Sequence, residues 1–383
     1  RIPWYVDGAN SVDTDDRCGP SHFDHRPPPR MTALADLLIA RIRETGPLTI
    51  AEYMAECMMH PKHGYYATRD PFGSAGDFTT APEISQMFGE LVGLSLAQSW
   101  LDQGAPASFA LVELGPGRGT LMADILRATR AVPGFIGAAE LHLVEASPKL
   151  RALQNETIPT RIKHHDSLET VPELPLFLVA NEFFDALPTR QFQRSGDGWR
   201  ECRVGEQDGA LTFGLSDPTT SSFLDARLED TKEGDIVEHA SATQAITTEI
   251  ARRIDANDGV ALIIDYGDWR SLGDTLQALS DHKPISPLVT PGACDLTTHV
   301  DFETIATAAA PAAFSRVTPQ GVFLERLGIT DRARMLAQSL EGDALESHIK
   351  AHRRLTHPQE MGTLFKVMAL YPATQTPPPG LEP

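Results

Sequence analysis

Residues 109–121 have the sequence Phe109-Ala-Leu-Val-Glu113-Leu-Gly115-Pro-Gly117-Arg-Gly119-Thr-Leu121. An apolar run ends here in an acid and is followed by three glycines at alternate positions. Because glycine has no Cβ atom, the backbone can turn sharply at these positions and approach a ligand closely. The stretch therefore predicts a buried strand that opens into a nucleotide-binding turn, with the charge of Glu113 at the end of the strand.

The spacing of the glycines distinguishes two classes of cofactor. A dinucleotide fingerprint has its third glycine three residues after the second, whereas Gly119 follows Gly117 by two, as in the ExGxGxG loop of class I methyltransferases. A second apolar run, at 141–145, ends in Glu145, whose carboxylate can accept both hydroxyl groups of a ribose. A glycine-rich turn alone is weak evidence, because such turns also occur in loops without a ligand. Together with Glu145, the turn favours S-adenosylmethionine over NAD.

Composition narrows the class of protein. The chain has 383 residues, of which 41% are hydrophobic, so we expect one large domain with insertions or a domain with a smaller lobe. No apolar run approaches the roughly eighteen residues of a membrane-spanning helix, so no membrane insertion is expected. The formal charge of −19 disfavours a nucleic-acid partner, because phosphates are bound by basic faces. The acidity is compatible with a basic substrate and equally with a role in solubility alone.

The four cysteines are scattered along the chain, at Cys18, Cys57, Cys202 and Cys294. They have neither CxxC spacing nor regular intervals, so neither a disulfide framework nor a metal site is expected. Their usage favours a reducing compartment.

The two ends of the chain differ in composition from its middle. Residues 1–30 are rich in Pro, Asp and Arg and show no period, which predicts a disordered extension before a helix that starts near Met31. The extension lacks the apolar core of a signal peptide, and its aspartates argue against a mitochondrial transit sequence. We therefore expect a bacterial cytoplasmic location, or a mitochondrial one for a eukaryotic homologue. Residues 372–383 are a Pro-rich tail.

The middle of the chain alternates between strand and helix patterns. This alternation predicts an α/β fold with a mostly parallel sheet and crossover helices. We expect a helical segment and cofactor-covering loop at 31–106, and a core at 107–371 with an insertion at about 186–258. The expected strands lie near 109–114, 141–145, 161–165, 175–181 and 259–265, with helices near 119–130 and 147–156.

Several flanking elements have clear local signals. Thr80 and Glu83 have the spacing of a capping box and are expected to start one helix whose apolar positions continue to Trp100. Within the insertion, residues 190–204 have the signature of a β-hairpin, and residues 238–256 that of a helix. The segments Phe314–Phe323 and Thr363–Tyr371 are expected to close the sheet as an antiparallel hairpin that carries a helical excursion.

From Met31 to Tyr371 the chain resembles the MidA-like methyltransferases. This family includes the mitochondrial protein arginine methyltransferase that assists the assembly of respiratory complex I. Besides Glu113–Gly119, the motifs that carry the resemblance are Met54-Ala-Glu-Cys-Met-Met-His-Pro61-Lys-His-Gly64-Tyr65-Tyr66, Gly76-Asp77-Phe-Thr-Thr80-Ala-Pro82-Glu83-Ile-Ser85-Gln-Met-Phe88-Gly89-Glu90, Asn181-Glu-Phe-Phe-Asp185-Ala-Leu-Pro188, Asp265-Tyr266-Gly267 and Asp295-Leu-Thr-Thr-His299-Val-Asp301-Phe302.

The resemblance implies a class I, Rossmann-like methyltransferase fold with S-adenosyl-L-methionine as the methyl donor. For the studied mitochondrial relative it implies symmetric dimethylation of an arginine in a complex I subunit. The expected partner is therefore a protein with an exposed arginine. Bacterial members of the family need not share that target.

Candidate catalytic residues follow the fourth expected strand. A guanidinium is protonated at physiological pH, and carboxylates can hold its planar fork and localise its charge. Glu182 and Asp185 are the candidates, with Asn181 beside them, at the sheet edge where open α/β folds bind ligands. These side chains could instead cap the next turn. If the acceptor were an amide or a hydroxyl, Asn181 would be the hydrogen-bonding member. His299 is a candidate proton acceptor on the substrate side.

Candidate cofactor residues come from several segments. Asp77, Thr80 and Pro82 precede a helix N-terminus that could face the amino-acid moiety of the cofactor, and the resemblance supports that role. Without it, a helix start is the simpler interpretation. Asp166 follows the third strand, where this fold often contacts the adenine amino group. The complete set of candidates is Asp77, Thr80, Pro82, Glu113, Gly115, Gly117, Gly119, Glu145 and Asp166.

Three further questions stay open at this point. Asp265 ends the fifth strand, and either a ligand contact or a structural turn fits its position equally well. The chain could also be a cofactor-binding assembly chaperone, or a small-molecule methyltransferase with a deep closed pocket. A homodimer is compatible with the sequence, although no feature demands one.

Overall fold

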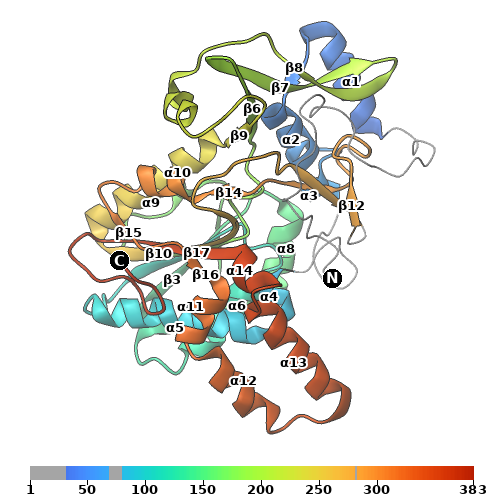
Figure 1. Ribbon diagram of the computed structural model, residues 1–383. Helices are drawn as coiled ribbons and strands as arrows, with labels where there is room; N and C mark the ends of the chain where they lie inside the picture. The colour runs from blue at the N-terminus through green and yellow to red at the C-terminus, as the bar shows by residue number, and fades with distance from the viewer. Residues whose placement is uncertain (1–31, 69–79, 281–282) are drawn as a thin grey trace.

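The computed structural model describes residues 32–68, 80–280 and 283–383 (Figure 1). The predicted extension over residues 1–30 and the predicted cofactor residue Asp77 lie outside these ranges.

A central, mostly parallel sheet organises the molecule. Its strand order is β4-β3-β2-β5-β10-β17-β15, in which β4 to β10 run parallel and β17 pairs antiparallel with β10. This topology confirms the predicted α/β class with an antiparallel C-terminal strand. The strands are β2 (Phe109–Leu114), β3 (Ala139–Val144), β4 (Lys163–His165), β5 (Leu176–Asn181), β10 (Gly259–Asp268), β15 (Ala313–Phe314), β16 (Thr318–Pro319) and β17 (Phe365–Tyr371), with β14 (Val300–Asp301) beside β10.

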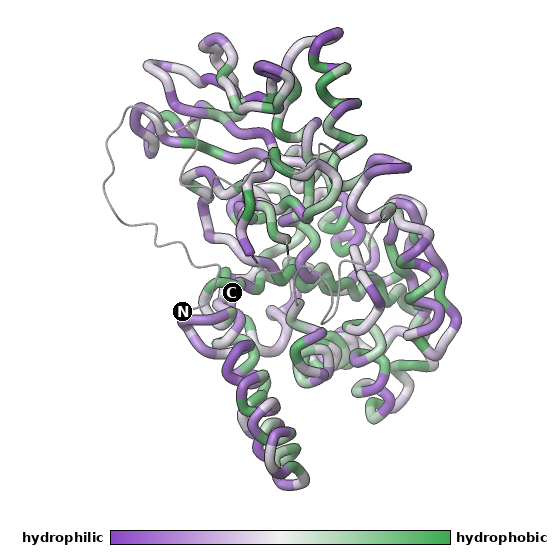
Figure 2. The backbone as a smooth tube through the Cα atoms, turned by 90° about the vertical axis from the view of Figure 1, so that its right-hand side faces the viewer, coloured by the Kyte–Doolittle hydropathy of each residue, from purple (hydrophilic) through white to green (hydrophobic). Residues whose placement is uncertain are grey.

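Alternate residues of each strand face opposite layers of helices, because side chains along a strand alternate between its two sides. On β2, Phe109 and Leu111 join the core on one face, whereas Ala110, Val112 and Leu114 join the core on the other. Figure 2 shows hydrophobic segments concentrated at the centre of the molecule. The first face is covered by α5 (Gln86–Asp102), α6 (Thr120–Thr129), α7 (Phe135–Ala138), α11 (Gln320–Arg326), α12 (Ile329–Ala337), α13 (Gly342–Thr356) and α14 (Met361–Leu364), and the second by η1 (Leu168–Thr170), α9 (Ser241–Asn257) and α10 (Phe302–Ala308).

The helix expected to start at Thr80 is interrupted. A short helix, α4 (Ala81–Ile84), is followed by Ser85, whose backbone is extended and breaks the helix. Ser85 is also the N-cap of α5, because its Oγ accepts a hydrogen bond from Met87 N at 3.2 Å. The predicted capping box does not form: the Thr80 side chain makes no capping bond, and Glu83 accepts a hydrogen bond from Thr120 Oγ1 at 2.5 Å. The tertiary contact with α6 therefore replaces the local one.

The insertion and the N-terminal helices form a second lobe. The predicted hairpin is present as β6 (Arg190–Ser195) and β7 (Gly198–Gln207), and β1 (Leu48–Thr49) pairs with β7. A core of buried residues joins the N-terminal helices to this sheet and to a three-stranded sheet. The remaining elements here are α1 (Ala33–Thr45), α2 (Ile50–Met59), α3 (Tyr65–Thr68), β8 (Ala210–Leu215), η2 (Ser222–Leu228), β9 (Ile236–His239), β11 (Gln277–Ser280), β12 (Lys283–Ile285) and β13 (Asp295–Thr297).

The helix expected at roughly 238–256 is present as α9 (Ser241–Asn257), and β9 continues through His239 before it as the edge of the insertion sheet. One expected strand is wrong. The expected strand Phe314–Phe323 is two short strands, and residues 320–326 are helical. Gln320 is fully buried there, and its Nε2 donates to Leu355 O at 3.0 Å, so packing against α13 selects the helix.

The helical excursion α12–α13 lies at the opposite end of the molecule from β7 and β8 (Figure 1). The Pro-rich C-terminal segment packs on the core: Arg316 N donates to Glu382 O at 2.9 Å, and Ser95 Oγ donates to Pro379 O at 3.0 Å. None of the helices in the described ranges combines the length and the apolarity that crossing a membrane requires.

The aromatic cluster beneath β2 gives a test of this core. Phe109 is fully buried, and its ring lies 4.9 Å from Phe135 and 5.1 Å from Phe177, whereas Phe314 on the edge strand β15 is 41% exposed. We expect Phe109→Ala to lower the free energy of unfolding by about 3–5 kcal/mol, because it leaves a cavity. Phe314→Ala is the control and should cost less than about 1 kcal/mol. Urea unfolding measures both, and equal losses would contradict the assigned core.

Candidate functional site

The glycine turn lies at the carboxyl end of β2, as predicted, and leads into α6. Gly115 and Gly119 have φ angles of +60° and +85°, which favour glycine. A Cβ atom would lie 2.9 Å from the Phe183 side chain at Gly115, and 2.9 Å from that of Ile158 at Gly119. The backbone is thus packed closely against the side chains of Phe183 and Ile158, and the turn leads directly into the N-terminus of α6.

Glu145 is joined to this turn through α8 (Pro148–Thr157). Its Oε1 accepts a hydrogen bond from Ser147 N at 2.8 Å. Gln154 Nε2 donates both to Gly117 O at 2.8 Å and to Glu145 Oε2 at 3.4 Å. Burial raises the pKa of the Glu145 carboxyl. The structure therefore brings the predicted ribose acid and the glycine turn together. It also shows that Gln154 links them, a role that the sequence of the helix does not indicate.

Glu113 is the buried acid beneath the turn. Its side chain is 3% exposed, and burial, with a smaller contribution from the charge of Glu145, raises the pKa of its carboxyl to about 8. A hydrogen bond from the backbone of Met122, in α6, opposes that shift. This hydrogen bond connects the Glu113 carboxyl to the first turn of α6. Its predicted cofactor contact stays a prediction.

Asp166 lies at the rim of the same edge. Its side chain is 88% exposed, and its Oδ1 accepts a hydrogen bond from Arg151 Nη2 at 2.6 Å. Arg151 also donates to Glu145 O through Nε at 2.7 Å, so the arginine connects Asp166 to the strand that carries the ribose acid. The contact of Asp166 with adenine stays a prediction.

The short helix α4 connects the two predicted halves of the site. Thr80 and Pro82 are buried at its start, and Ala81 N donates to Glu182 Oε1 at 3.1 Å. The segment predicted to contact the cofactor therefore touches an acid predicted to hold the acceptor.

Asn181 is the last residue of β5, and Glu182 and Asp185 lie in the turn that follows it. Glu182 has a φ angle of +51°, a region that residues other than glycine rarely adopt and that is often found at functional sites. Its Oε1 also accepts a hydrogen bond from Asn181 Nδ2 at 3.1 Å. Asn181 Oδ1 and Asp185 Oδ1 are buried and have no hydrogen-bond partner in the part of the chain that the structure describes. Two acceptor atoms are therefore available in one small turn.

The two acids of this turn titrate differently. Burial and the charge of Asp185 raise the pKa of Glu182 to about 8. Burial also raises the pKa of Asp185, to about 6, and a hydrogen bond with Tyr266 limits that rise. Burial therefore favours the neutral form of both carboxyl groups.

Tyr66 lies between the cofactor side and the acceptor side. Burial raises the pKa of its phenol, and the charges of Asp295, Asp185 and Glu145 raise it further, which places all three carboxyl groups near its side chain. Its backbone oxygen accepts a hydrogen bond from Ser147 Oγ at 3.0 Å. The sequence contains Tyr66 and Asp295 in motifs, but their proximity depends on packing between the lobes.

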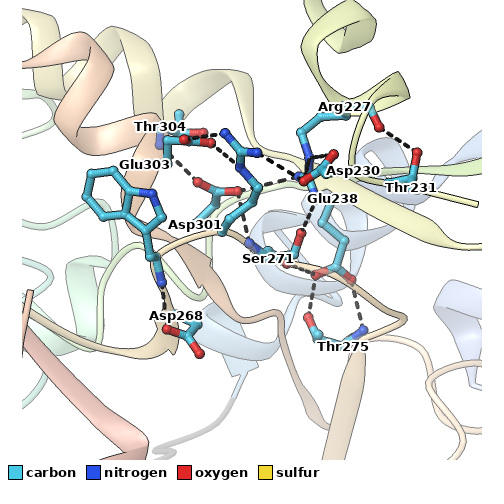
Figure 3. Close-up of polar contacts among 12 residues, drawn as sticks. Arg227, Asp230, Thr231, Glu238, Asp268, Ser271, Thr275, Asp301, Glu303 and Thr304 are labelled. Atoms are coloured by element: carbon cyan, nitrogen blue, oxygen red, sulfur yellow. Dashed lines mark hydrogen bonds and ion pairs between the residues drawn. The ribbon is translucent and has the colours of Figure 1, made fainter.

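His299 packs against Tyr266, which is hydrogen-bonded to Asp185. Its imidazole packs edge-on against Tyr266 at 5.4 Å between ring centroids, and burial lowers its pKa. Its backbone N donates to Thr275 Oγ1 at 2.8 Å, and Thr275 in turn is bonded to Glu238 (Figure 3). Within the described ranges no hydrogen bond joins the imidazole to Glu182 or Asp185. Its role as a proton acceptor stays a prediction.

Comparison with known proteins places this geometry in context. Residues 91–319 match the family model Methyltransf_28, described as "Putative S-adenosyl-L-methionine-dependent methyltransferase". The chain is 37% identical to the protein arginine methyltransferase NDUFAF7 homolog, mitochondrial, of Drosophila melanogaster, over 89% of this chain and 85% of that protein. It is 35% identical to the protein arginine methyltransferase NDUFAF7, mitochondrial, of Homo sapiens, over 89% and 84%.

A solved structure carries the cofactor product. A protein from Burkholderia thailandensis bound to S-adenosyl-homocysteine superposes with a TM-score of 0.79 and 30% identity, over 91% of this chain and 94% of that one. The class I methyltransferase fold and S-adenosyl-L-methionine as the cofactor, both expected from the sequence, are thereby confirmed.

Glu145 gives a direct test of the cofactor side. We expect Glu145→Ala to weaken S-adenosyl-L-methionine binding about 10- to 100-fold, since a hydrogen bond to a charged group contributes about 1.5–3 kcal/mol. Glu140→Ala is the matched control, because Glu140 lies at the other end of β3 with its side chain 39% exposed. Isothermal titration calorimetry measures both affinities. An unchanged affinity in Glu145→Ala would contradict the assignment of the ribose acid.

Proposed function

Since the chain belongs to the Methyltransf_28 family of S-adenosyl-L-methionine-dependent methyltransferases, we propose that it methylates the side chain of arginine in a partner protein. The observation that carries the proposal is the turn after β5, where Asn181, Glu182 and Asp185 present buried oxygen atoms beside the glycine turn. By analogy with its relatives, we further propose symmetric dimethylarginine as the product and a respiratory complex I subunit as a candidate target.

The cofactor side of the chain fits the methyl donor. Side chains at Gly115 and Gly119 would collide with their neighbours, and Glu145 is held beside this turn by Ser147 and Gln154. S-adenosyl-L-methionine supplies a methyl group on a sulfonium, so that the leaving group is already activated. The protein must mainly place the nucleophile in line with that methyl group.

The acceptor side has the polarity that a guanidinium requires. A guanidinium offers five N–H donors in one plane and no acceptor. Asn181 Oδ1 and Asp185 Oδ1 are hydrogen-bond acceptors that the described residues do not satisfy, and Glu182 adds a second carboxyl group. Burial makes this arrangement selective, because a desolvated carboxylate is stabilised strongly by a cation that enters the same site.

The two carboxyl groups support separate roles. Asp185, with the lower pKa, holds the positive charge of the bound guanidinium. Glu182, which keeps its proton until about pH 8, must lose it for the pair to hold the cation fully. As the new carbon–nitrogen bond forms and the carbon–sulfur bond breaks, the attacking nitrogen loses a proton. We assign the Asp185 carboxylate as the group that receives that proton.

Labelled methyl transfer tests the proposed acceptor. The purified protein is incubated with methyl-labelled S-adenosyl-L-methionine and a lysate from a strain that lacks the enzyme, and labelled residues are identified by mass spectrometry. We expect dimethylarginine on one protein, and a loss of about 100-fold or more in the rate for Glu182→Gln, because a buried charge partner of the acceptor is removed. Cofactor affinity should stay within about threefold.

Glu201→Gln is the matched control for that substitution. Glu201 is also a buried glutamate, but it lies in β7 of the insertion, where it pairs with Arg190 and Arg203. It should retain transfer. Label on another residue type, or on small molecules alone, would contradict the arginine proposal. Partner binding without any label would favour an assembly chaperone.

The raised pKa of Glu182 predicts a pH dependence. Below about pH 8 its carboxyl is protonated in the free protein and cannot pair with the cation, so kcat/KM should rise about tenfold per pH unit towards pH 8 and then level off. Steady-state assays between pH 6 and 9 measure the profile. Glu182→Gln should remove this limb from the residual activity, and a limb that persists in that variant would assign it to another group.

A further inference from the structure

Asp265 is a fully buried aspartate in β10 that directly contacts the turn of the candidate acceptor site. Its Oδ2 accepts hydrogen bonds from Phe184 N at 3.0 Å and from Asp185 N at 3.3 Å. Its Oδ1 accepts one from Tyr266 N at 2.9 Å. One carboxylate on a neighbouring strand therefore binds two successive amides of the turn.

This arrangement costs free energy. A buried carboxyl is destabilised unless a cation or several donors satisfy it. In the described ranges Asp265 forms no salt bridge with Lys or Arg, and Asp185 and Glu182 add two further acids nearby. Burial and these two charges raise its pKa well above the ordinary value. The three backbone donors are the interactions that offset this cost.

The turn is held from two sides. On the β10 side, Glu182 N donates to Ile264 O at 2.9 Å, immediately before Asp265. On the β13 side, Thr298 N donates to Asp185 O at 2.9 Å. The peptide groups on both sides of Asp185 are thus held by neighbouring strands, and the left-handed backbone of Glu182 lies within the same restrained segment.

We propose that Asp265 is the positioning residue of the acceptor site, which sets the directions of Glu182 and Asp185 through the backbone of the turn. Asp265 does not itself contact the acceptor: both of its oxygens are occupied by main-chain amides. This inference rests on the proposed function for the place where the acceptor binds. Of the two roles that the sequence leaves open for Asp265, a ligand contact or a structural turn, this inference selects the structural one. The turn that Asp265 supports is the one that carries the candidate acceptor acids.

Asp301 supplies a comparison within the same sheet. It ends β14, the neighbour of β10, and its carboxylate accepts hydrogen bonds from Ser271 N at 3.1 Å and Thr304 N at 2.9 Å (Figure 3). Its interactions hold the start of α10 and bring it within 3.9 Å of Arg227 Nη1, and in the described ranges it has no hydrogen bond with Glu182 or Asp185. A purely structural role for Asp265 predicts that Asp265→Asn and Asp301→Asn behave alike, because each replaces one oxygen acceptor of backbone amides by an NH₂ group.

The experiment compares these two variants on whichever acceptor the labelling identifies. For Asp265→Asn we expect kcat to fall about 100-fold, since misplacement of reacting groups by about 1 Å has effects of that size. We expect its affinity for S-adenosyl-L-methionine, measured by calorimetry, to stay within about threefold of the wild type. Asp301→Asn should retain kcat within about threefold. Equal kcat values in two folded variants with matched cofactor affinity would overturn the proposal.

Hydrogen exchange in the wild-type protein covers the case in which Asp265→Asn does not fold. The amides of Phe184 and Asp185 should be protected, because Asp265 binds both, and rapid exchange at either one would overturn the proposal. The proposed function fails separately. If wild-type enzyme labels a residue other than arginine, the acceptor assignment is wrong, while the difference between Asp265→Asn and Asp301→Asn still reports on positioning.

Discussion

The parallel pairing of β2, β5 and β10 is the constraint on which the rest of the structure depends. Parallel strands end at the same edge of a sheet, so whatever follows each strand is brought to one place. The register aligns Leu114 with Ala180, and Ile264 with Asn181. The glycine turn, the acid-rich turn and Asp265 thereby become neighbours although the sequence separates them by tens of residues. The apolar alternation on both faces of these strands holds that register against slippage.

The site concentrates carboxyl groups where water is largely excluded. Glu113, Glu182 and Asp185 all have raised pKa values, and burial is the first cause for each. Such a set is unfavourable in isolation, because each carboxyl loses hydration and repels the next. Under the proposed function, the same desolvation favours a cationic acceptor at this site.

The second lobe contributes to the site through a few polar connections. The network around Glu238 and Arg227 joins the insertion to the core: Arg227 Nη2 donates to Ser271 O at 2.9 Å, and Thr275 N donates to Glu238 Oε1 at 3.0 Å (Figure 3). Thr275 also binds the backbone of His299, next to the amide that contacts Asp185. The insertion is therefore connected by hydrogen bonds to the segment that contacts the turn after β5.

The sequence by itself determined the fold class and the cofactor class, because these depend on local patterns: the period of apolar residues, the glycine spacing, and acids at strand ends. The role of the acids after β5 in holding an acceptor stays a prediction. Only the tertiary structure decided the break at Ser85, the helical path of residues 320–326, the link from Gln154 to Glu145 and the use of Asp265 as a support for the turn. At Ser85 a contact between α6 and Glu83 replaces the expected capping box, and at Gln320 burial against α13 overrides the strand pattern. Each of these features depends on a contact with a residue far away in the chain. A sequence pattern reports only the local preference of a segment for helix or strand, which is about 1 kcal/mol, and a tertiary contact can exceed it.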